Sequence, residues 1–205
     1  MLKKSFYWLV VFGFVANCSG LGEIKISHDS FRNAHIVTVK LGNRSQEKVA
    51  TSFQVASFLL PTYNGTFEFS REIKAGKPNA SEIQLSIIAS NDNPLLTAKG
   101  AVRIGEKSFD LAVTDISGET VTNMKAEAKE NSITGKTSVS TSTQSYKVLR
   151  GKIILNKEIE DLILKSNDFT LRLYSGNYPI TFVIVGDDFL KLKEFLTTKP
   201  DPNQI

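Results

Sequence analysis

The clearest evidence for the fold lies near the carboxyl end of the chain, where residues 169–185 read FTLRLYSGNYPITFVIV. From Phe169 to Leu173, apolar residues at odd positions alternate with Thr and Arg at even positions, the period-two pattern of a strand with one buried face. Gly176-Asn177 then predicts a turn. The following residues, 180–185, are apolar on both faces, as expected of a covered central strand.

Strand-like segments of the same kind recur along most of the chain. Glycine, asparagine and proline separate them, and these residue types mark turns. About ten strands at short, regular spacing favour a mainly β fold, either an antiparallel β-sandwich or an open barrel. The other predicted strands are 36–41, ending at Gly42-Asn43; 53–60, ending at Pro61; 67–69, starting after Asn64-Gly65; 83–88; 101–104; 109–113; and 151–155.

Two helices are predicted in the last third of the chain. Residues 157–164 carry apolar side chains on one helical face. Asp187-Asp188 can cap a C-terminal α-helix in which Phe189, Leu192 and Phe195 recur at helical spacing. That helix is expected to end before Pro200.

Length and composition limit the chain to one main domain. It has 205 residues, of which 41% are hydrophobic, enough for one packed core. We expect a single β-rich domain over 23–198, followed by a tail over 199–205. A single cysteine excludes a disulfide scaffold and a CxxC redox centre. His28 and His35 lie seven residues apart, which would place them on opposite faces of one strand, so neither a metal site nor a cofactor is expected.

The amino-terminal segment has the pattern of a signal peptide. Lys3 and Lys4 precede eleven uncharged residues, 6–16. This run is too short for a spanning helix, which needs about 20 apolar residues. Residues 1–17 are therefore predicted to direct export. Their removal leaves 23 Lys and Arg against 21 Asp and Glu, so no nucleic-acid partner is expected.

Val15-Ala16-Asn17-Cys18 resembles the lipobox of bacterial lipoproteins, in which a branched apolar residue stands three places before a cysteine. Asn17 stands where most bacteria have Gly, Ala or Ser, and the segment is similar to the looser lipoboxes of spirochaetes such as Leptospira. The resemblance implies cleavage before Cys18, lipidation of its thiol and a short tether over 18–22. Ser19 and Gly20, which directly follow Cys18, include no Asp, which implies anchoring in the outer membrane. The alternative is ordinary cleavage after Gly20, which would release an unanchored protein.

A Ser/Thr-rich segment over 120–145 differs from the rest of the chain. It is expected either to form an exposed hairpin that turns near Gly135 or to be a mobile loop. It could serve as a spacer. Alternatively, an exposed strand edge could recruit a protein partner by β-augmentation.

No catalytic constellation is found. Ser45 and Lys48 match SxxK, but the preceding Asn43-Arg44 predicts a hairpin loop rather than the helix that this motif needs, so we interpret the match as coincidence. The sequence therefore predicts a non-catalytic binding or structural module of the cell envelope, anchored to a membrane and with host or matrix ligands if it faces outward. The alternatives are a periplasmic hydrolase and a carrier of an apolar ligand, the latter motivated by the many phenylalanines.

Overall fold

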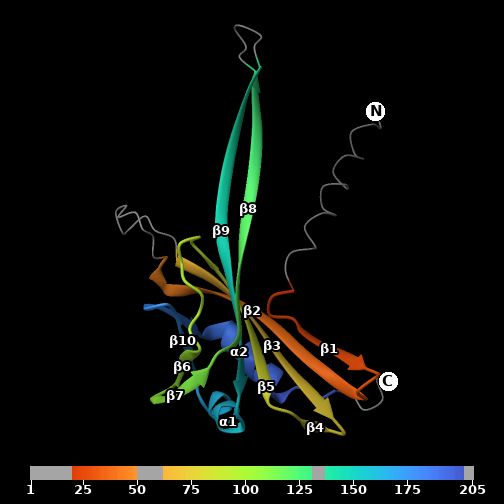
Figure 1. Cartoon of the computed structure of the whole chain (residues 1–205). Coiled ribbons are helices and arrows are strands. Elements are labelled where there is room, and N and C mark those ends of the chain that lie inside the picture. Colours follow the sequence, from red (N-terminus) through yellow and green to blue (C-terminus); the bar gives the residue numbers. More distant parts are fainter. Residues whose placement is uncertain (1–19, 50–61, 131–136, 201–205) are drawn as a thin grey trace, which may run out of the picture.

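Strand pairing dominates the part of the chain that the computed structural model describes, residues 20–49, 62–130 and 137–200 (Figure 1). One helix comes before the last β-hairpin of the chain and one comes after it. They are β1 (Ile24–Asp29), β2 (Ala34–Lys48), β3 (Thr62–Lys74), β4 (Lys77–Pro78), β5 (Ser81–Ala89), β6 (Lys99–Ile104), β7 (Lys107–Ala112), β8 (Thr114–Glu130), β9 (Thr137–Leu155), α1 (Lys157–Lys165), β10 (Phe169–Ser175), β11 (Tyr178–Ile184) and α2 (Gly186–Thr197).

All these strands belong to one antiparallel sheet that curls into a half-barrel (Figure 1). The order is β7-β6-β10-β11-β2-β3-β5-β9-β8, with β1 and β4 paired to β2 and β3. Strand β2 joins the half of the sheet formed by β7, β6, β10 and β11 to the half formed by β3, β5, β9 and β8. Strands β1 and β3 flank the first part of β2, while Ser45 near its end pairs with Phe182 of β11. The prediction of a mainly β fold with a C-terminal helix is confirmed, in the open-barrel form rather than the sandwich.

Strands β2 and β3 remain paired at two positions where the sequence predicts turns. Asn43 pairs with Gly65 in the middle of the two strands, so the predictions of turns at Gly42-Asn43 and Asn64-Gly65 were wrong. The glycine is needed for packing, because a Cβ at Gly65 would lie 2.7 Å from the ring of Phe182 and 2.8 Å from that of Phe67. The strand predicted over 53–60 falls outside the described residues.

The two helices lie where the sequence predicts them. Asn156 caps α1, its Oδ1 accepting the Ile159 N–H at 2.9 Å. In α2 the capping prediction was wrong: Val185 occupies the cap position, and Asp187 and Asp188 lie inside the first turn. The chain reaches that turn through Gly186 at φ 62°, a left-handed conformation that glycine adopts without strain.

Helix α2 supplies much of the core. Phe189, Leu192 and Phe195 are each at most 2% exposed and belong to the same cluster as the buried strand residues. The Phe195 ring lies 6.2 Å from the ring of Phe69 in β3, a contact typical of aromatic pairs. The concave face of the half-barrel is therefore packed against the helices.

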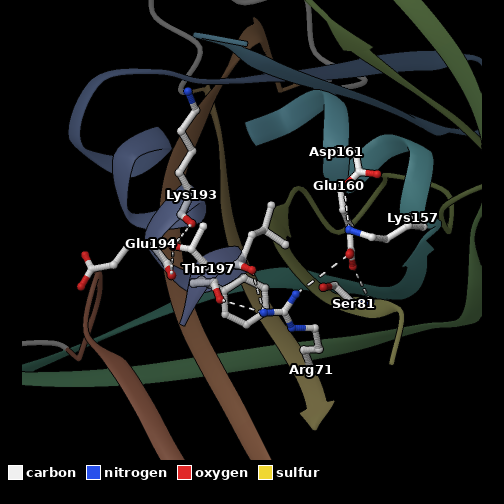
Figure 2. A network of polar contacts seen from close by, with 10 residues as sticks. Arg71, Ser81, Lys157, Glu160, Asp161, Lys193, Glu194 and Thr197 are labelled. Atoms are coloured by element: carbon white, nitrogen blue, oxygen red, sulfur yellow. Dashed lines mark hydrogen bonds and ion pairs between the residues drawn. The ribbon is translucent and has the colours of Figure 1, made fainter. Parts of the chain in front are cut away.

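A buried polar network fixes the end of α2 to β3 and α1 (Figure 2). Nη2 of Arg71 donates to the carbonyl oxygens of Phe195 at 3.3 Å and Leu196 at 2.8 Å. Nη1 of Arg71 lies 4.0 Å from Oε2 of Glu160, whose Oε1 accepts the Ser81 N–H at 2.9 Å. Desolvation lowers the pKa of Arg71, and the charge of Glu160 opposes this shift. Because Arg71 is only 6% exposed, the network is structural rather than accessible to a substrate.

Candidate functional site: the β8–β9 arm

Strands β8 and β9 form a long hairpin that projects from the half-barrel (Figure 1). We call the part beyond the β5 pairing, residues 120–130 and 137–146, the arm. Strand β5 ends at Ala89, which pairs with Lys147 of β9. Farther out, β9 pairs only with β8 among the described residues, and β8 is the last strand of the sheet. Both edges of the arm thus lack a neighbouring strand in the described part of the chain.

The expected exposed hairpin is confirmed by this pairing, which runs from Thr120–Lys147 to Glu130–Thr137. The predicted turn near Gly135 lies outside the described residues. Met124 is 74% exposed, and Thr122 and Ser145 share a hydrogen bond of 3.1 Å across the ribbon. Cross-strand pairs of this kind contribute only about 0.2–1 kcal/mol each, so the arm gains little stability from its own side chains.

The root of the arm is tightly held. A Cβ at Gly118 would lie 2.5 Å from Cδ2 of Leu95, and one at Gly151 would lie 2.8 Å from Cγ1 of Val113. Nζ of Lys147 donates to the carbonyl oxygen of Asn93 at 2.7 Å. The hairpin is therefore closely packed where it leaves the half-barrel.

Over the described residues, no neighbouring strand pairs with the backbone N–H and C=O groups that point outward along the two edges of the arm. Such a row is a template for pairing with another extended chain. Segment 120–130 contains no proline, so each of its residues has a backbone N–H donor. The arrangement can bind a specific extended segment.

The two histidines lie close together rather than apart. His28 on β1 pairs directly with His35 on β2, with ring centroids 5.0 Å apart. The prediction of opposite faces was wrong because a hairpin turn, not one continuous strand, separates them. In the described ranges, no group of three or more His, Cys, Asp or Glu is placed to hold a metal ion.

Ser45 lies in β2 and not in a loop, which corrects the hairpin predicted at Asn43-Arg44. Its side chain donates to the carbonyl oxygen of Glu47 at 2.6 Å and accepts the Tyr63 N–H at 2.9 Å. The residue is 5% exposed. The hydroxyl thus bridges β3 through the Tyr63 N–H and closes a local bond within β2 through Glu47, where β2 leaves its regular register.

Cys18, the predicted lipidation site, and the signal peptide lie outside the described residues. The first described residues join the sheet, since the Gly22 N–H donates to the carbonyl oxygen of Lys40 at 2.7 Å. Over the ranges that the structure describes, none of the helices has the length and apolar character needed to cross a membrane.

No protein-family model, curated protein or solved structure matches the chain.

Proposed function

We propose that the protein is a lipid-anchored, non-catalytic binding module of the bacterial envelope, and that its arm binds an extended segment of a protein partner by strand addition. The observation that carries the proposal is the arm itself, a ribbon whose two edges have no strand neighbour in the described structure. In strand addition, main-chain hydrogen bonds supply affinity and alternate side chains supply specificity.

The lipobox resemblance at Val15-Ala16-Asn17-Cys18 supports the anchoring half of the proposal. Two or more acyl chains on Cys18 would hold the protein at a membrane, since each buried CH₂ contributes about 0.8 kcal/mol. The absence of Asp at Ser19 and Gly20, directly after Cys18, favours the outer membrane. On an outward face the partner would be a host or matrix protein, and on a periplasmic face an envelope protein.

The spacer, hydrolase and apolar-carrier alternatives have less support. A spacer needs neither a closely packed root nor an edge without a strand neighbour. The serine of the SxxK match is buried, and its hydroxyl is engaged by the Glu47 carbonyl oxygen and the Tyr63 N–H. The phenylalanines that motivated a carrier include Phe67, Phe182 and Phe195, none of them measurably exposed and all packed in the core.

Site-specific photo-crosslinking in the producing bacterium tests the arm. A photoreactive phenylalanine replaces Met124, which is 74% exposed on the arm, or Ile154, which is 60% exposed on the half-barrel and serves as the matched control. We expect a discrete protein adduct from position 124 and none from position 154. No adduct from position 124, or the same adduct from both positions, would contradict the proposal.

A second pair of variants tests whether the partner binds the backbone of the arm rather than its side chains. With the crosslinker at position 124, the double variant Asn123→Pro and Lys125→Pro removes two N–H donors and should abolish the adduct. The double variant Thr141→Ala and Thr143→Ala changes side chains only and should keep it. Loss of the adduct in the alanine variant and survival in the proline variant would show side-chain recognition instead.

A further inference from the structure

A second surface, unrelated to the arm, lies on the outer face of the other half of the sheet. Strands β6, β7, β10 and β11 and the end of β2 enclose a hollow of about 320 Å³. Its lining is rich in hydroxyl and guanidinium groups and contains no carboxylate. The polar lining residues are Gln46, Arg103, Ser108, Thr170, Arg172 and Thr181.

Strand register brings two arginines together in this hollow. Arg103 of β6 pairs with Thr170 of β10, and Arg172, two residues farther along β10, pairs with Ala101. The arginines are thus diagonal neighbours on one face of the sheet, within reach of each other's long side chains. Two adjacent guanidinium groups repel each other unless an anion lies between them.

Neither arginine is neutralised within the described structure. Arg103 and Arg172 form no ion pair with any described residue, and the one hydrogen bond of the Arg172 side chain is donated by Nε to Oγ1 of Thr181 at 3.0 Å. Two carboxylates lie beside the hollow without pairing with either arginine. Oε2 of Glu47 accepts the Thr181 N–H, and Asp110 of β7 lies opposite Ala101 of β6, diagonal to Arg103.

The floor of the hollow holds a polar atom without a partner. Thr170 is only 7% exposed, and its Oγ1 is shielded from solvent and forms no hydrogen bond in the described structure. A buried hydroxyl without a partner is unfavourable and calls for an explanation. An acceptor entering between the exposed side chains of Arg103 and Arg172 would satisfy it.

We propose that this hollow, the Arg103–Arg172 pocket, binds a phosphate or sulfate group carried on a larger molecule. Planar guanidinium groups bind tetrahedral oxyanions through paired N–H donors, and the hydroxyls of Ser108 and Thr170 can donate to the remaining oxygens. The volume lies at the lower end of the range for small-molecule sites and exceeds what one oxyanion fills, so the ligand is a monoester, such as a sugar phosphate, a sugar sulfate or a phosphorylated lipid headgroup.

The test is a binding titration of the full chain, purified in an uncharged detergent. The probes are inorganic phosphate, inorganic sulfate, glycerol 3-phosphate and a short-chain, water-soluble phosphatidic acid, followed by calorimetry. We expect saturable binding that weakens about tenfold or more in Arg103→Gln and in Arg172→Gln, because each variant loses a charge-assisted hydrogen bond. Thr170→Val, which keeps the shape of the side chain, should also weaken binding.

Arg150→Gln is the matched control. Arg150 is an exposed arginine on the outer face of β9 whose Nη1 is paired with Oε2 of Glu119 at 2.7 Å, so its loss should leave binding unchanged. Tighter binding of phosphatidic acid than of glycerol 3-phosphate would identify a lipid source, and the reverse a soluble ester. Absence of saturable binding for all four probes, or equal weakening in Arg150→Gln and Arg103→Gln, would overturn the proposal.

Discussion

Replacement of Arg71 by methionine tests the buried network that holds α2. The substitution keeps an unbranched side chain but removes both hydrogen bonds to the end of α2, at 2.8 and 3.3 Å, and the cation that lies 5.5 Å from the Phe195 ring. It also leaves Glu160, whose side chain is 4% exposed, as a buried carboxylate with the Ser81 N–H as its remaining described partner.

The expected cost follows from the unpaired charge. Removing one partner of a buried ion pair costs about 3–5 kcal/mol, against a total stability of about 5–15 kcal/mol for a domain. With a urea m-value of about 1–3 kcal/mol/M, the unfolding midpoint should fall by about 1 M or more. Equilibrium urea unfolding of the full chain in detergent, followed by circular dichroism, measures this change.

A double variant separates the charge from the lost packing. Adding Glu160→Gln to Arg71→Met neutralises the stranded carboxylate while keeping an acceptor for the Ser81 N–H. The double variant should therefore be more stable than Arg71→Met alone, with a coupling energy of about 0.5–3 kcal/mol. Equal midpoints for the single and double variants, or a loss below about 1 kcal/mol in Arg71→Met, would refute the reasoning.

Three further predictions concern packing, pH and anchoring. Gly65→Ala should destabilise the protein by about 1–3 kcal/mol in urea unfolding, because its Cβ would lie 2.7 Å from the Phe182 ring; an unchanged midpoint would contradict the packing argument. Burial, and secondarily the charge of Asp187, raises the pKa of Asp188, so the folded state binds that proton more tightly than the unfolded chain. The protonated carboxyl therefore stabilises the folded state below a pH of about 3.9, the pKa of Asp in the unfolded chain, and this contribution is lost as the pH rises through the raised pKa of the folded state. Asp188→Asn should accordingly be more stable than the parent chain at pH 7 and equally stable near pH 3. Cys18→Ser should move the protein from the membrane fraction to the soluble fraction and abolish incorporation of labelled palmitate; retention of both would contradict lipidation. Proteinase K treatment of intact and permeabilised cells, with the parent chain, would then distinguish an outward from a periplasmic face.

Many strands of this fold could be predicted from local alternation, but β1, β4 and some strand ends could not. Alternation predicts β5, β6, β7 and β10 closely because each has one buried face. Asn64-Gly65 has the composition of a hairpin turn, yet the glycine serves to admit two aromatic rings. That role depends on Phe182, which is distant in the sequence, so no local pattern could have revealed it.

The arm and the Arg103–Arg172 pocket likewise differ in how far the sequence could predict them. The Ser/Thr-rich composition of 120–145 predicts, without any tertiary information, either an exposed hairpin or a mobile loop, and the structure has the hairpin. Arg103 and Arg172, by contrast, become neighbours only through the register of β6 on β10. The pairing of His28 with His35 likewise follows from the turn between β1 and β2, which the seven-residue spacing alone could not distinguish from one strand.

The energetics of α2 argue that ligands bind outside the half-barrel. Four of its side chains, Phe189, Leu192, Phe195 and Leu196, are at most 6% exposed, and burying each contributes about 1.5–3 kcal/mol. Their sum, about 6–12 kcal/mol, is comparable to the whole stability of a typical domain, before the Arg71 hydrogen bonds are added. Helix α2 therefore cannot leave the concave face to admit an apolar ligand without unfolding the protein. The arm edges and the Arg103–Arg172 pocket need no such displacement, and they present two different chemistries, backbone pairing and charge.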